Sequence, residues 1–241
     1  MTDAELETLV ALLDTQTRAE ADWGRVADYI PPLARVEPAQ FALCLCLADG
    51  REIAAGDADI PFSIQSVSKV FTLALALGRF GDGLWRRVGK EPSGDPFNSI
   101  IQLETEHGIP RNPFVNAGAI VTTDAILTGR APRDTLAEIL QFVRAAAGDD
   151  AIHINRHVAR AETETGHRNH SLAHFLKSCG NLENSCEKTL GTYHHHCAIE
   201  MSARQLARAG RFLCAGAAFT PLIPAARVRA INALMMTCGH Y

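Results

Sequence analysis

Strand-forming segments lie only in the first quarter of this chain, and that imbalance most restricts its fold. Residues 41–47 form a short apolar run, Asp49-Gly50 is a hairpin signal, and residues 52–55 can return as a second strand. A two-stranded ribbon is only marginally stable by itself. The sheet therefore either includes strands that the pattern does not reveal, or the chain ends before supplying them.

The rest of the chain has mainly helical periodicity. Helices are predicted near residues 117–128, 134–147, 151–163, 170–179, 202–215 and 224–237. An N-terminal helix is also predicted, because Thr2 and Glu5 form a capping-box pattern before an apolar stripe. Strands followed by helices suggest an α/β or α+β arrangement with a helical lobe.

Length, charge and cysteine usage exclude several classes of protein. The 241 residues predict one large domain or two intimate lobes. A net charge of −4 gives no support to a nucleic-acid-binding face. No apolar run approaches the roughly 18 residues of a membrane span, and the acidic N-terminus lacks a secretory pattern. The seven cysteines include no C-x-x-C pair, which predicts reduced thiols in a cytoplasmic protein.

The sharpest local motif is Ser66-Val67-Ser68-Lys69. It opens a stretch, residues 66–77, whose apolar density predicts a helix buried on nearly all sides. At a spacing of three residues, the serine hydroxyl and the lysine amine lie on one helical face. A buried lysine has a lowered pKa and can then act as the base that a serine nucleophile needs. The alternative is a helix-capping serine with an unrelated lysine.

Two other patterns are weaker. Ser185-Cys186-Glu187-Lys188 repeats the S-x-x-K spacing in polar surroundings, which favours a solvated helix end. His153/His157 and His170/His174 have the spacing of a metal-binding pair on a helix. No H-E-x-x-H motif is present, so exposed or hydrogen-bonded histidines are favoured.

Several longer motifs, in the same order, resemble the serine-dependent glutaminases, a family related to β-lactamases and penicillin-binding proteins. Those motifs are Val26–Pro31, Phe62–Lys69, Glu91–Asn98, Asn112–Ile120, Gly166–Asn169, Phe175–Ser178, Gly180–Glu183, Thr192–Tyr193 and Thr237–Gly239. The resemblance implies a β-lactamase/transpeptidase-like α/β fold, with an antiparallel sheet flanked by helices and a helical lobe. It implies one catalytic domain over 1–241, with a sheet-associated lobe of 1–80 and 205–241 and a helical lobe of about 81–204.

The same resemblance implies hydrolysis of L-glutamine to L-glutamate and ammonia, without cofactor or metal. Ser66 would attack the side-chain carboxamide to form a glutamyl-enzyme, Lys69 would be its base, and Tyr241 would transfer a proton at the leaving amide. Glu162 matches the family's partner for the substrate ammonium group. The other substrate-binding matches, which include the nucleophile itself, are Tyr29, Gln65, Ser66, Asn116, Asn169, Tyr193 and Tyr241.

This chain also departs from the family pattern. His194, His195 and His196 follow Tyr193 where relatives usually have an aromatic residue first. Relatives continue past Tyr241 into a Lys-Ser-Gly strand, so C-terminal strands and one oxyanion donor are expected to be missing from an incomplete sheet. Self-association as a homo-oligomer is implied by the family alone.

Three alternative functions remain open. A β-lactamase or peptidase would share Ser66 and Lys69, although no Ser-Asp-Asn or Lys-Thr-Gly motif is present. A metal-binding or scaffold protein would use the histidines. An inactive fragment would bind glutamine without turnover.

Overall fold

The computed structural model describes residues 2–20, 23–214 and 221–239 of the chain. The α-helices are α1 Asp3–Arg18, α2 Ser68–Phe80, α3 Ile100–Thr105, α4 Asn116–Leu127, α5 Pro132–Ala147, α6 Arg156–Thr165, α7 His167–Ser178, α8 Cys186–Cys197, α9 Ala203–Gly210 and α10 Ala225–Thr237. The strands are β1 Ala42–Cys46, β2 Glu52–Gly56, β3 Phe62–Ser63, β4 His153–Ile154 and β5 Ile199–Met201. Short 3-10 helices span Leu33–Arg35, Gln65–Val67, Gly81–Arg86 and Arg211–Leu213.

The strands form two small antiparallel sheets. β1 pairs with β2 from Ala42 opposite Gly56 to Cys46 opposite Glu52, which confirms the predicted hairpin. The second sheet has the order β3-β5-β4 and joins segments far apart in the sequence. Its strands are two or three residues long, too short for an alternating pattern, so the sequence did not reveal them.

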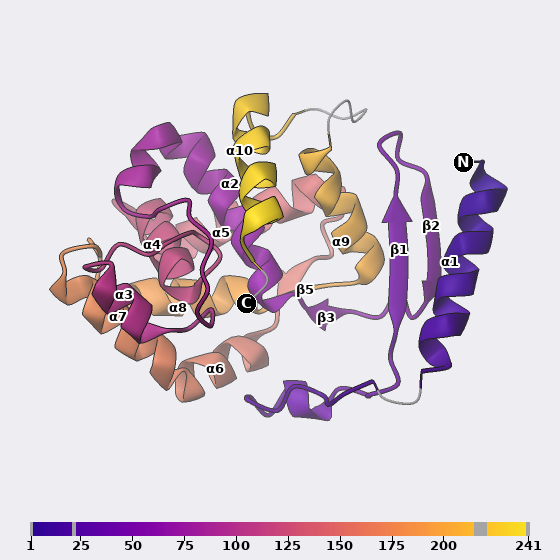
Figure 1. Ribbon diagram of the computed structural model, residues 1–241, viewed down its shortest axis with the longest axis horizontal. Coiled ribbons are helices and arrows are strands. Elements are labelled where there is room, and N and C mark those ends of the chain that lie inside the picture. Colours follow the sequence, from indigo (N-terminus) through magenta and orange to yellow (C-terminus); the bar gives the residue numbers. More distant parts are fainter. Residues whose placement is uncertain (1, 21–22, 215–220, 240–241) are drawn as a thin grey trace.

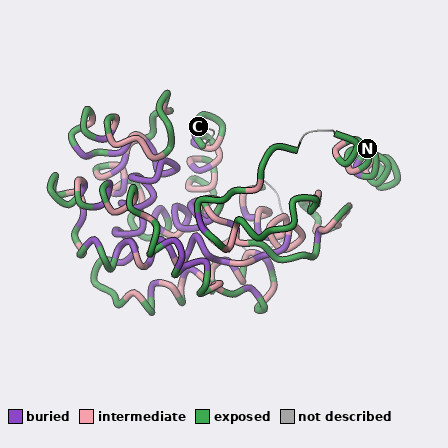
Figure 2. Tube along the Cα trace, turned by 90° about the horizontal axis from the view of Figure 1, so that it is seen from below, coloured by how far each residue is buried: buried purple, intermediate pink, exposed green. Residues whose placement is uncertain are grey.

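Helix α4 lies at the centre of the hydrophobic core. Every residue from Asn116 to Leu127 is buried, and α2, α7 and α8 pack against it. Figure 2 shows the buried trace concentrated inside the main body of the molecule, away from the N-terminal helix. The predicted buried helix is confirmed as α2, which begins at Ser68 after a 3-10 turn. The turn with Ser66 is therefore anchored to the core.

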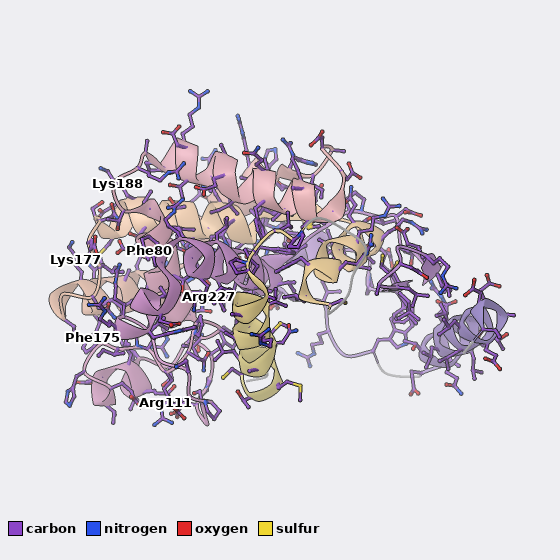
Figure 3. The ribbon with its side chains drawn as sticks, turned by 90° about the horizontal axis from the view of Figure 1, so that it is seen from above. Phe80, Arg111, Phe175, Lys177, Lys188 and Arg227 are labelled. Carbon is purple, nitrogen blue, oxygen red and sulfur yellow. The ribbon has the colours of Figure 1, made fainter. Side chains whose placement is uncertain are left out.

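The β1–β2 hairpin lies at one side of the molecule, away from the main body of helices (Figure 1). Helix α1 packs on β2 and marks that end in Figure 3 as well, while α9 packs on β1. The molecule is thus a mixed α/β protein dominated by helices, as predicted. The division into lobes of 1–80 with 205–241 and of 81–204 stays a prediction.

One predicted helix had the wrong start, and helices α3 and α8 were absent from the predicted set. The helix expected over 151–163 begins only at Arg156, because His153 and Ile154 pair with β5 instead. Consequently His153 and His157 do not share a helix. For α8, the sequence indicated only a helix end near Ser185, since three histidines and Gly191 conceal the buried face of the helix.

Candidate active site

Ser66 lies in the short turn that leads into α2, and Lys69 lies in the first turn of α2 itself. The 3-10 helix Gln65–Val67 runs directly into α2. Ser66 is exposed, whereas Lys69 is only 3% exposed. The predicted nucleophile is therefore accessible to a substrate, and the predicted base is shielded from water.

The surroundings of Lys69 suit an uncharged amine. Its Nζ donates hydrogen bonds to the Phe114 carbonyl at 2.9 Å and to Asn116 Oδ1 at 2.7 Å. Burial lowers the pKa of Lys69 to about 8. A neutral amine has two N–H groups and one lone pair. These two acceptors can take both N–H groups, which leaves the lone pair for a proton.

A tightly constrained loop brings those acceptors to Lys69. The Asn112 side-chain oxygen accepts hydrogen bonds from the backbone N–H groups of Phe114 at 3.0 Å and Val115 at 3.2 Å. At Gly118 of α4, a Cβ atom would lie 1.9 Å from the Asn112 carbonyl oxygen, so only glycine allows this approach. The close approach sets the loop directly against the first turn of α4, which bears Asn116.

Asn116 also connects Lys69 to a second predicted substrate-binding residue. Its Nδ2 donates to Asn169 Oδ1 of α7 at 2.9 Å. The amide orientation of Asn116 is thus determined on both sides, because its oxygen accepts from a lysine and its nitrogen donates to an amide oxygen.

Glu162 of α6 is a buried carboxylate with an unused acceptor. It is 8% exposed, and its Oε1 atom has no hydrogen-bond partner among the described residues. Burial raises the pKa of the Glu162 carboxyl, and a hydrogen bond from Tyr29 partly opposes that rise. A buried acceptor of this kind is costly unless a donor satisfies it, and a ligand ammonium group would do so.

The other predicted substrate-binding residues that the structure describes lie near the Ser66 turn and Glu162. The hydroxyl oxygen of the exposed Tyr29 lies 3.3 Å from Gln65 Oε1. Tyr193 of α8 is 3% exposed; burial raises the pKa of its hydroxyl, and the charges of Cys197 and Glu162 contribute. Gln65 has a φ of +46°, which is uncommon for a residue other than glycine. Tyr241 lies outside the described residues.

The comparisons with known proteins identify the family. The glutaminase family model matches residues 24–241. A glutaminase of Rhodopseudomonas palustris strain TIE-1 is 57% identical over 245 residues, covering 100% of this chain and 79% of the relative. This chain belongs to the glutaminase family.

Solved structures agree with this family membership. A structure of the probable glutaminase ybaS matches with a TM-score of 0.92 at 33% identity, over 98% of this chain and 77% of that one. A structure of Mglu in its L-glutamate binding form matches with a TM-score of 0.90 at 32% identity. That match covers all of this chain and 56% of Mglu.

Other chemically interesting features of this glutaminase-family chain lie apart from the predicted site. A groove of about 950 Å³ is bordered by residues such as Trp23, Phe41, Asn155 and Glu200, and none of the predicted site residues lines it. Among the described residues, no group of three or more His, Cys, Asp or Glu side chains could hold a metal ion. Ser185 accepts a hydrogen bond from the Lys188 backbone N–H and caps α8, as its polar context suggested. None of the described helices is long and apolar enough to cross a membrane.

Sequence reasoning missed a group of buried residues behind Ser66. Ser68, His196 and Cys197 are buried and adjoin one another, with 2.8 Å from Ser68 Oγ to His196 Nδ1 and 3.8 Å from Ser68 Oγ to Cys197 Sγ. A signal was present, because positions three and four after Tyr193 lie on the same helical face. That signal required knowing that α8 is a helix.

Proposed function

We propose that this chain hydrolyses L-glutamine to L-glutamate and ammonia through a covalent intermediate on Ser66. Membership of the glutaminase family supports the reaction. The observation that most supports the serine mechanism is the buried Lys69 amine, held by two acceptors three residues after an exposed serine. This family assignment favours a glutaminase over a β-lactamase or a histidine-based metal protein.

The first half-reaction forms an ester. Ser66 Oγ attacks the side-chain carbonyl carbon of glutamine while its proton passes to the neutral Lys69 amine. The resulting tetrahedral intermediate expels ammonia, which takes a proton as the C–N bond breaks. We assign that proton to the Lys69 ammonium formed in the attack, passed through Tyr241, the residue predicted to transfer a proton at the leaving amide.

The second half-reaction restores the serine. Water attacks the glutamyl ester, its proton passes to Lys69, and the C–O bond to Ser66 breaks as the serine oxygen regains a proton. L-glutamate then leaves. No electrons are exchanged and no cofactor enters either step.

Selection for glutamine would come from residues that bind its α-ammonium and α-carboxylate groups. The unpartnered Oε1 of Glu162 suits the α-ammonium group by a charge-assisted hydrogen bond. Asn116, Asn169 and Tyr193 supply amide and hydroxyl donors suited to the α-carboxylate. Tyr29 and Gln65 line the approach to Ser66. A cytoplasmic location stays a prediction from cysteine usage and the N-terminal sequence, and assembly into a homo-oligomer stays a prediction from family resemblance.

The test is ammonia release from L-glutamine by purified protein. Ser66→Ala should lower kcat by at least about 10³-fold. Ser185→Ala is the matched control: it removes the serine of the second S-x-x-K, costs roughly 0.5–2 kcal/mol of stability as a lost helix cap, and should leave kcat unchanged. Added hydroxylamine should divert the acyl-enzyme to the glutamyl hydroxamate. A Ser66→Ala protein with kcat within tenfold of wild type would refute the serine mechanism.

A further inference from the structure

A buried hydrogen-bonded chain lies directly behind the Ser66 turn. The His196 ring of α8 is fully buried. Its Nδ1 is 2.8 Å from Ser68 Oγ, and its Nε2 is 3.0 Å from Thr123 Oγ1 on α4. Ser68 Oγ is in turn 2.6 Å from the backbone carbonyl oxygen of Gln65. These hydrogen bonds therefore connect Thr123 of the core helix α4 to Gln65, the residue that precedes the proposed nucleophile.

Gln65, where this series of hydrogen bonds ends, has a strained backbone conformation. Gln65 has the left-handed backbone conformation, with φ at +46°. Such a conformation is unfavourable for a side-chain-bearing residue and persists where surrounding contacts enforce it. A shift at Gln65 would redirect the next residue, Ser66. The hydrogen bond from Ser68 to the Gln65 carbonyl is one contact that opposes this shift.

The protons of this network can be arranged in two ways, one for each tautomer of the His196 ring, and the first keeps Ser68 on the Gln65 carbonyl. The Gln65 carbonyl can only accept, so in this first arrangement the single hydroxyl proton of Ser68 lies on that 2.6 Å bond. Ser68 Oγ must then accept the second bond from an N–H at His196 Nδ1. Burial, together with the charge of Lys69, lowers the pKa of His196 to about 3, so the ring is neutral and carries one proton. Nε2 is therefore unprotonated and accepts from the Thr123 hydroxyl.

The other tautomer would arrange the bonds differently. With the proton on Nε2, Thr123 Oγ1 would accept a hydrogen bond from Nε2–H. The Thr123 hydroxyl would then donate to the Ala119 carbonyl, 2.8 Å away. Ser68 would have to donate to Nδ1 and would release Gln65. The His196 contacts with Ser68 at 2.8 Å and with Thr123 at 3.0 Å are made in both arrangements, so the arrangements differ in one bond: Ser68 to the Gln65 carbonyl at 2.6 Å, or Thr123 to the Ala119 carbonyl at 2.8 Å. This difference favours the proton on Nδ1.

We infer that His196 is a positioning residue for Ser66: its Nδ1–H holds the Ser68 hydroxyl on the Gln65 carbonyl and thereby sets the orientation of the nucleophile. The inference rests on the proposed role of Ser66. His196 touches no reacting atom in this scheme and acts only through Ser68 and Gln65. The weak 3.8 Å contact of Ser68 with Cys197 is not a substitute for the imidazole donor.

Two substitutions at His196 separate hydrogen bonding from packing. His196→Asn keeps an N–H donor near the Nδ1 position, whereas His196→Leu has similar size and no donor. His196→Leu should lower kcat about five- to tenfold, corresponding to one lost hydrogen bond, with KM for glutamine within about twofold of wild type. His196→Asn should recover most of kcat. His194→Leu, a matched loss of a buried ring in α8, should leave kcat unchanged.

A second measurement does not depend on activity. Nitrogen NMR of histidine-labelled wild-type protein, with His196→Asn used for assignment, should show the His196 proton on Nδ1, and so should Ser66→Ala protein. A proton on Nε2, equal kcat in His196→Leu and wild type, or equal loss in His196→Leu and His196→Asn would overturn the inference. Failure of the proposed function is a distinct result: wild-type protein would not release ammonia, or Ser66→Ala would remain active. The tautomer can be measured even if His196→Leu does not fold.

Discussion

Replacing Glu162 with glutamine should weaken substrate binding and leave the protein no less stable. Glu162 is 8% exposed and has an unpartnered Oε1, so it is poorly satisfied until an ammonium group arrives. A hydrogen bond to a charged group contributes about 1.5–3 kcal/mol. Losing it should raise KM for L-glutamine by roughly 10- to 150-fold, with a smaller effect on kcat.

The sign of the stability change follows from the pKa of Glu162. Burial raises the folded-state pKa of this carboxyl, so its contribution favours folding at low pH and is lost as pH rises from the unfolded-state pKa through the raised folded-state value. Above the raised folded-state pKa, the ionised carboxylate therefore lowers the free energy of unfolding. Glu162→Gln removes that cost, and the melting temperature should stay the same or rise by about 2–4 °C for each kcal/mol recovered.

The assay compares steady-state kinetics with thermal unfolding for wild type, Glu162→Gln and Glu164→Gln. Glu164 lies on the same helix in an exposed ion pair with Arg160, so its substitution should change neither KM nor melting temperature appreciably. Wild type should also prefer glutamine over the analogue without an α-amino group, and Glu162→Gln should lose much of that preference. An unchanged KM in Glu162→Gln, or a clear loss of melting temperature, would refute the assigned role.

Three further predictions concern the base and the core. Because the pKa of Lys69 is lowered to about 8, kcat/KM should rise with pH through an acid limb near that value, and Asn116→Asp should move the limb to higher pH by placing a carboxylate beside the ammonium. Lys69→Met should reduce kcat by at least about 10³-fold, measured as ammonia release at pH 8.5, with circular dichroism unchanged. Asp124, fully buried, accepts hydrogen bonds from Arg87 and the Glu183 N–H, so Asp124→Asn should lower the free energy of unfolding by about 3–5 kcal/mol in urea titrations. Hydrogen bonds lower the pKa of Asp124 despite its burial, so its wild-type contribution is present at neutral pH and is lost as pH falls through the folded-state pKa.

Elements with their own periodicity were predictable, and those that depend on distant partners were not. The hairpin of β1 and β2 has a turn signal between two runs, and α5 ends at Gly148 in the left-handed conformation. β5 pairs instead with residues far away in the sequence: Glu200 lies opposite His153, 47 positions earlier, and opposite Ser63, 137 positions earlier. Two-residue pairings of this kind leave no trace in local sequence.

Helix α8 illustrates a different difficulty. Its buried positions include Thr189, Thr192, His194 and His196, which an apolar-stripe criterion assigns to the surface. The helix is stabilised by packing on α4, α5 and α6, and its polar groups are satisfied there, as Thr189 donates to Asp124 at 3.0 Å. Burial of polar side chains is decided by partners from other elements, so composition alone cannot indicate it.

The candidate site separates along the same line. The Ser-x-x-Lys spacing indicated Lys69, and family resemblance added Asn116 and Asn169; the structure joins the three through consecutive hydrogen bonds. The sequence did not reveal the buried hydrogen bonds through Ser68 and His196, because the chemical role of a histidine depends on which of its two nitrogens carries the proton. That proton is assigned from the acceptors around the ring. The Gln65 carbonyl accepts a hydrogen bond from the Ser68 hydroxyl, and Ser68 Oγ then accepts one from the imidazole Nδ1–H. On this assignment, a buried imidazole that never contacts the substrate sets part of the reaction rate at the exposed Ser66.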